Sequence, residues 1–173
     1  MNGVALGLLV IRLGLGAMLA VHGLNKVLGP GGLAGTARWF DGLGLHPGWL
    51  HARLAAANEV GAALLMAAGL AFPAAGAAFI GLMAVAAVTD HRGKGFFVFK
   101  GGWEYVALIA VISAAVVSTG PGRYSLDAAL GWRLAGPGWA GLAIVVGLAA
   151  AAGLYLIATR ATRRPADRVP TPE

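Results

Sequence analysis

Two polar residues, Asn58 and Glu59, lie inside a stretch from Leu54 to Phe72 in which every other residue is apolar or glycine. A helix of this length can cross a bilayer. A carboxylate in hydrocarbon costs about 2.5–3.5 kcal/mol on insertion scales, so it is expected to face the interior of a helical bundle and to have a partner. A carboxylate in that position can also transfer protons in a redox reaction. We therefore predict that Glu59 and Asn58 belong to a buried polar site.

Other ionisable residues reach the same depth if the apolar stretches alternate in direction across a membrane. His22 lies about 9 Å from the end of the first apolar stretch, at about 1.5 Å of rise per residue. Lys26 lies one helical turn further along, on the same helix face. His91 follows the third apolar stretch and Glu104 begins the fourth. The sequence thus predicts a polar site made by four helices.

Arg12 lies on the other half of the first stretch, roughly 15 Å from His22. It can pair with Glu59 if the helices are tilted, extend toward lipid headgroups, or bind carbonyl groups of the facing helix. For Glu59 the predicted neighbours are His22, as a hydrogen-bond donor, and Glu104, as a carboxylate that shares a proton. The catalytic candidates are Glu59 and His22, and the candidates for binding quinone or another ligand are Lys26, Asn58, His91, Glu104 and Arg12.

The residue types favour a quinone or lipid headgroup over a metal or haem. A metal site would need His22, Glu59, His91 and Glu104 together, and none of them forms a close-spaced ligand pair on one helix. A haem held by His22 and His91 has the same weakness. Purely structural interpretations remain open: Glu59 can be an anchor, and Glu104 can interact with a helix dipole. We therefore predict no metal site.

The composition is that of an integral membrane protein. Of 173 residues, 58% are hydrophobic and 12% are charged, against about 25% charged in soluble domains. The mean hydropathy is +0.77. Since the chain has no cysteine, it has no dithiol pair, thiolate metal site or cysteine-ligated iron–sulfur cluster. The net charge is +6, and the basic residues fall in loops between the apolar stretches. Membrane topology explains this distribution better than a nucleic-acid partner does.

Five apolar stretches predict five transmembrane helices, and residues 33–44 predict a short amphipathic helix on the membrane surface. The fold class is an all-α membrane protein: a four-helix transmembrane bundle with an additional, peripheral C-terminal transmembrane helix. The expected spans are residues 4–28, 54–72, 74–89, 103–119 and 139–159. The expected domains are a core at 1–132, the fifth transmembrane helix at 133–159, and a basic disordered cytoplasmic tail at 160–173.

The basic residues predict the orientation. With the tail in the cytoplasm, ten of the Lys and Arg residues fall on the cytoplasmic side and two, Arg123 and Arg133, fall outside. Positive charge collects on the cytoplasmic side of membrane proteins. We therefore expect a multi-pass protein of the plasma membrane with its N-terminus outside and its C-terminus in the cytoplasm.

Several segments resemble the DoxX family in order and spacing, over about residues 6–130. They are residues 12–13, 22–26, 31–36, 59–61, 68–70, 91–97, 101–105 and 120–127. DoxX proteins are similar to the DoxD subunit of thiosulfate:quinone oxidoreductase, and the resemblance implies a membrane part of an oxidoreductase complex. It does not assign catalytic residues.

The expected function is an integral membrane subunit of a membrane-associated oxidoreductase complex. A link to quinone is one option, and the sequence leaves the cofactor open. One alternative is a non-catalytic anchor that binds soluble redox enzymes at the cytoplasmic face through its basic loops. Another is a transporter of a small molecule or lipid. The sequence leaves open whether the chain is itself an enzyme and whether it forms a homo-oligomer.

Overall fold

The computed structural model describes residues 3–160. Of the predicted basic tail at 160–173, Arg160 is the last residue of α7, and residues 161–173 lie outside the described range. Within residues 3–160 the chain is all-helical, as predicted, with seven α-helices and no strand. The helices are α1 (Gly3–Leu28), α2 (Gly32–Gly42), α3 (Gly48–Ala68), α4 (Phe72–Val88), α5 (Glu104–Thr119), α6 (Leu126–Ala129) and α7 (Pro137–Arg160), and a short 3₁₀ turn, η1, covers Val98–Lys100.

Two helices, α1 and α7, are long and apolar enough to cross a membrane by length and composition. The helices α4 and α5 are apolar but have only 17 and 16 residues. The helix α3 begins at Gly48, six residues before the predicted span of 54–72, because Pro47 is extended. It ends at Ala68, four residues before Phe72, because Gly69 takes a left-handed conformation (φ 64°). Left-handed glycines commonly end helices. The short helix predicted at 33–44 is present as α2.

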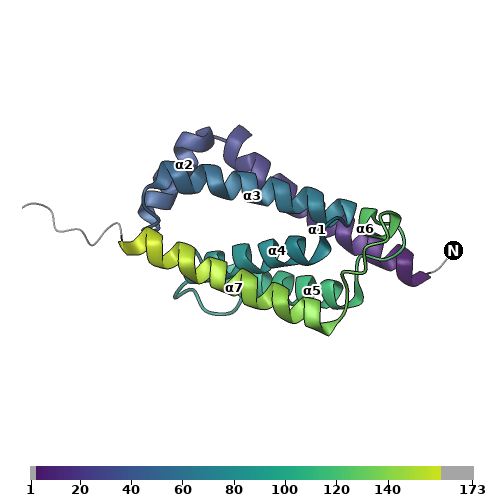
Figure 1. Cartoon of the computed structure of the whole chain (residues 1–173). Coiled ribbons are helices and arrows are strands. Elements are labelled where there is room, and N and C mark those ends of the chain that lie inside the picture. Colours follow the sequence, from purple (N-terminus) through teal and green to yellow (C-terminus); the bar gives the residue numbers. More distant parts are fainter. Residues whose placement is uncertain (1–2, 161–173) are drawn as a thin grey trace, which may run out of the picture.

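The helices form two groups that lie side by side (Figure 1). One group contains α1, α2 and α3, and the other contains α4, α5 and α7. Small residues allow α1 and α3 to approach closely: a Cβ atom on Gly16 would lie 2.9 Å from Ala63 O, and one on Gly23 would lie 2.8 Å from Val60 Cγ2. Close packing through small residues is typical of helices in lipid.

The last helix, α7, is not peripheral, so that part of the sequence prediction is wrong. A Cβ atom on Gly147 would lie 2.6 Å from Ala77 O on α4, and one on Gly81 would lie 3.0 Å from Gly147 O. Ala140 and Ala143 are buried in the main hydrophobic core. The sequence favours a place outside the bundle because this helix carries no ionisable group to the polar site, but glycine and alanine are sufficient for close packing.

Candidate functional site

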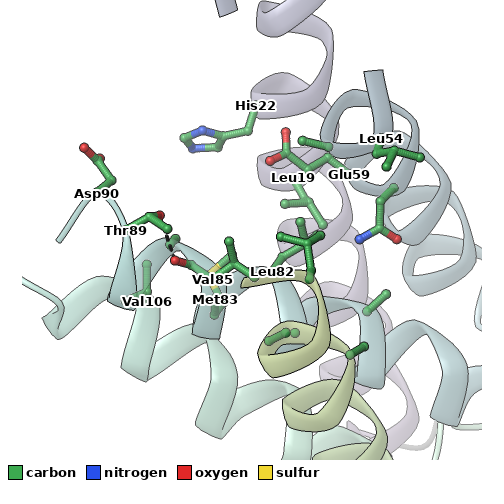
Figure 2. Close-up of a pocket in the computed structure, with 18 of the residues that line it drawn as sticks. Leu19, His22, Leu54, Glu59, Leu82, Met83, Val85, Thr89, Asp90 and Val106 are labelled. Carbon is green, nitrogen blue, oxygen red and sulfur yellow. Dashed lines mark hydrogen bonds between the residues drawn. The ribbon is translucent and has the colours of Figure 1, made fainter. Parts of the chain in front are cut away.

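A cavity of about 860 Å³ lies between the two groups of helices. Figure 2 shows part of its lining, with Leu19 and Glu59 on one side and Leu82 and Met83 on the other. Small-molecule pockets have volumes of about 300–1,000 Å³ and are mostly apolar with a few polar groups. The polar residues of the lining are His22, Lys26, His51, Asn58, Glu59, Thr89, Asp90, His91 and Tyr105.

The carboxylate of Glu59 is bound by Lys26. The Lys26 Nζ atom lies 2.8 Å from Glu59 Oε1 and 2.6 Å from Glu59 Oε2. Only 13% of the Lys26 side chain and 11% of the Glu59 side chain are exposed. The approach of α3 to Gly23 places Glu59 beside α1, since a Cβ atom on Gly23 would lie 3.0 Å from Glu59 Cβ. The predicted partners, His22 and Glu104, are therefore wrong, although the predicted need for a partner is met.

His22 and Asn58 line the same cavity without a hydrogen-bond partner among residues 3–160, and both are exposed there. His22 lies one turn before Lys26 on α1, as the sequence predicts. Figure 2 shows the His22 ring extending over the cavity toward the side where Thr89 and Asp90 lie. Both side chains keep their hydrogen-bonding capacity available for a ligand.

Asp90, just after α4 ends, lies on the side of the cavity toward which the His22 ring extends (Figure 2), and the next residue, His91, also lines the cavity. Asp90 Oδ1 accepts a hydrogen bond from Lys94 Nζ at 3.3 Å. His91 Nδ1 lies 2.6 Å from Gly101 O. Because a carbonyl oxygen only accepts, His91 Nδ1 carries the proton of this hydrogen bond. His91 lines the cavity, as the sequence predicts. Its role in binding a quinone or another ligand stays a prediction.

Glu104 does not reach the cavity. Its Oε2 atom accepts a hydrogen bond from the backbone N–H of Val98 at 3.0 Å, within the loop that precedes α5. It does not appear in the cavity lining. The expected proton sharing between Glu104 and Glu59 therefore has no geometric basis, because the loop between α4 and α5 folds back over the start of α5.

Arg12 is buried at the other end of the bundle, 1% exposed. Its Nη1 donates to Pro121 O at 2.9 Å and its Nη2 donates to Tyr124 O at 2.6 Å. Of the three arrangements that the sequence left open, carbonyl binding is the one adopted, but the carbonyls belong to the loop before α6. Arg12 therefore fastens this loop to α1 and does not take part in the cavity.

The sequence prediction missed His51, which is buried and lines the cavity. Its Nε2 atom lies 3.2 Å from His46 O, and its Nδ1 atom has no partner in the described part of the chain. Residues 51, 55 and 58 share one helix face by their spacing, and all three line the cavity. The spacing of residues 51, 55 and 58 would have indicated His51 if the predicted helix had extended back to Gly48, where α3 begins.

Across residues 3–160, no group of three or more His, Cys, Asp or Glu side chains is arranged to hold a metal ion. Residues 7–92, about half of the chain, match the family model described as DoxX. The chain belongs to the DoxX family. The matched part of this DoxX protein contains the cavity residues from α1, α3 and the end of α4, but not α5 or α7. Comparisons with curated proteins and with solved structures gave no significant match.

Membership of the DoxX family, together with the apolar helices α1 and α7, points to a membrane protein. In a bilayer, a charged Lys26 or Glu59 without a partner would be costly, since isolated charges are disfavoured in hydrocarbon. Mutual neutralisation reduces that cost and leaves the cavity wall with little net charge.

Proposed function

We propose that this DoxX protein is an integral membrane subunit of an oxidoreductase complex, and that its cavity binds a quinone. The observation that carries the proposal is the cavity of about 860 Å³, which combines apolar walls with the Lys26–Glu59 pair and the unpartnered His22. Family membership supports the link to oxidoreductases only in general terms.

Charge compensation favours a neutral ligand. Lys26 is bound to Glu59, and Asp90 is bound to Lys94. A small anion would therefore have to compete with Glu59 for Lys26, at the cost of leaving a carboxylate unpaired in an apolar site. A quinone has no net charge, offers carbonyl acceptors, and has an apolar tail that suits the Leu82 and Met83 wall.

The residues have distinct expected roles. His22 and Asn58 can donate hydrogen bonds to carbonyl oxygens. Glu59 and His22 are the proposed proton-handling groups, with the proton held at a Glu59 carboxylate oxygen or a His22 ring nitrogen. Lys26 orients Glu59, and His91 is held in place by Gly101 O at 2.6 Å. When bound, a quinone would supply the capacity to accept two electrons and two protons.

We further propose that α1, α3, α4, α5 and α7 all cross the plasma membrane, with the N-terminus outside and the C-terminus in the cytoplasm. The alternating directions of these helices support this topology (Figure 1). The excess of Lys and Arg at the α2 end of the bundle supports the orientation. The division into a core at 1–132, a helix at 133–159 and a tail is not tested by the structure. Since Ala140 and Ala143 of α7 belong to the main hydrophobic core, we propose that the core and the fifth helix fold as one unit.

The substitution Glu59→Gln tests the catalytic part of the proposal, because it preserves the shape and a hydrogen bond while it removes the charge. The measurements are thermal stability in detergent and quinone-linked reductase activity of the complex, side by side. The proposal expects a protein that still folds, with a lower unfolding temperature because Lys26 loses its charged partner, and that has lost turnover. Full activity in a folded Glu59→Gln protein would favour a non-catalytic anchor for soluble redox enzymes, the second candidate, which the exposed basic residues Arg53 and Arg92 support.

A further inference from the structure

The loop between α4 and α5 has a fixed shape although it buries almost none of its side chains. The backbone N–H groups of Gly102, Trp103 and Glu104 donate to Phe97 O, Gly95 O and Phe96 O at 2.9, 3.2 and 2.9 Å. Its first and last turns are joined by His91 Nδ1 and Gly101 O at 2.6 Å. A loop held this firmly has a defined outer surface.

That outer surface is aromatic and basic. Phe96, Phe97, Phe99 and Trp103 are 45%, 51%, 77% and 45% exposed. Phe97 stacks on Phe99 with ring centroids 5.3 Å apart, and Phe96 meets Trp103 edge to face at 4.9 Å. The basic residues of the loop are Arg92, Lys94 and Lys100, and all three are exposed. Trp is enriched at the boundary between hydrocarbon and lipid headgroups, and Phe and Trp together with Lys and Arg are typical of segments that lie in that boundary.

The helix α7 gives the depth of this loop. The N–H of Gly136, next to the start of α7, donates to Ser118 O at the end of α5, at 2.9 Å. At the other end, Arg92 Nη1 donates to the Tyr155 hydroxyl at 3.3 Å. Tyr155 lies about 27 Å along α7 from Pro137, at about 1.5 Å per residue, and the hydrocarbon core is about 30 Å thick. If α7 crosses the bilayer as proposed above, with Pro137 at one edge of the hydrocarbon, the loop is level with the other edge.

The lengths of α4 and α5 lead to the same depth. With 17 and 16 residues, each is shorter than the ~20 residues that a spanning helix needs. The missing length falls at the loop, since the other end of α5 is level with the start of α7. Aromatic side chains there would complete the apolar path that the two helices leave unfinished.

We propose that the α4–α5 loop is embedded at the boundary between the acyl chains and the headgroups of the bilayer. Phe96, Phe97 and Phe99 contact acyl chains, and the exposed cations extend to lipid phosphates. Long basic side chains reach outward in this way while their stems stay in apolar surroundings. Lys94 can do so while it stays paired with Asp90 at 3.3 Å, since 45% of its side chain is exposed. Because Asp90 and His91 line the cavity, that wall of the cavity lies at the same depth.

Since the chain has no cysteine, a single introduced cysteine can carry a nitroxide label at a chosen depth. The full-length Phe99→Cys and Phe97→Cys variants are labelled separately and placed in phospholipid nanodiscs. Depth is measured from collisions with oxygen and with a water-soluble nickel chelate, calibrated with nitroxide phospholipids. The control is Val111→Cys, at a position 66% exposed near the middle of α5. Each loop variant keeps three of the four rings, so two positions guard against local disturbance.

The proposal expects the labels at Phe97 and Phe99 to lie at or below the phosphate level, shallower than the label at Val111. Collisions with the nickel chelate should be well below those of a label in water. Labels at both loop positions that lie above the phosphates, with the Val111 label still near the bilayer centre, would overturn the proposal. That outcome would leave the loop in water as a surface for a soluble protein.

Discussion

Lys26 on α1 and Glu59 on α3 form a two-oxygen ion pair, with Lys26 Nζ at 2.8 and 2.6 Å from the two carboxylate oxygens. Both groups are largely buried at the cavity wall. Removal of one partner leaves the other charge uncompensated, whereas removal of both does not. The pair therefore couples the stability of the α1–α3 contact to the polarity of the cavity.

The first prediction concerns this coupling. Lys26→Met should lower the free energy of unfolding by about 3–5 kcal/mol, because Glu59 then lacks its charged partner in a largely buried position. The double variant Lys26→Met, Glu59→Leu should recover most of the loss. The measurement is reversible unfolding of the single and double variants in mixed micelles. Additive losses in the double variant would contradict the coupling.

The second prediction concerns the packing of α7 on α4. Gly147→Ala should destabilise the protein by about 1–3 kcal/mol, the usual cost of overpacking, because the new Cβ would lie 2.6 Å from Ala77 O. The matched control is Gly153→Ala on the same helix, where a Cβ would meet nothing within 4 Å. Thermal unfolding in detergent compares the two, and equal unfolding temperatures would be inconsistent with close α4–α7 packing.

The third prediction concerns the start of α4. Asp127 accepts hydrogen bonds from the N–H groups of Ala71 and Phe72 at 2.8 and 3.0 Å. Asp127→Ala should cost about 1–2 kcal/mol of stability, because it removes a helix cap. Asp127→Asn keeps one acceptor oxygen and should cost less. Unfolding measurements on both variants should give this order, and the reverse order would contradict the capping role.

The fourth prediction concerns orientation. A reporter fused after Glu173 should be active only if it functions in the cytoplasm, because ten basic residues fall on the predicted cytoplasmic side and two fall outside. A matched fusion before Met1 should give the opposite result. A C-terminal reporter that is active only outside the cytoplasm would reverse the proposed topology.

The helices could be predicted from the sequence because apolar stretches and their interruptions are local signals. The predicted first span, 4–28, corresponds to α1 (Gly3–Leu28), and the Gly-Pro-Gly-Gly segment at 29–32 marks its end. The short helix α2 was indicated by its amphipathic period. The start of α3 was missed because the polar residues His51 and Arg53 interrupt the apolar pattern.

The candidate site was only partly predictable, because rise along a helix gives depth but not rotation about the helix axis. The sequence places His22 and Glu59 at one depth and Lys26 one helical turn from His22 on the same face, and all three line the cavity. Which of them meet depends on the close approach at Gly23, a tertiary contact. Glu104 has a suitable depth, but its carboxylate binds Val98 N–H in a loop whose shape the sequence did not reveal.

The most direct test of the central claim is quinone binding to a protein whose cavity has been filled. Ala150 lines the cavity, whereas its neighbour Ala149 does not, and both are exposed. The affinity of purified Ala150→Trp and Ala149→Trp for a short-chain quinone is measured by calorimetry in micelles, after both are shown to be monodisperse. We predict that Ala150→Trp weakens binding at least about tenfold, or ~1.4 kcal/mol, and that Ala149→Trp binds as the unchanged protein does. Equal quinone affinity in the two variants would contradict the assignment of the cavity as the quinone site.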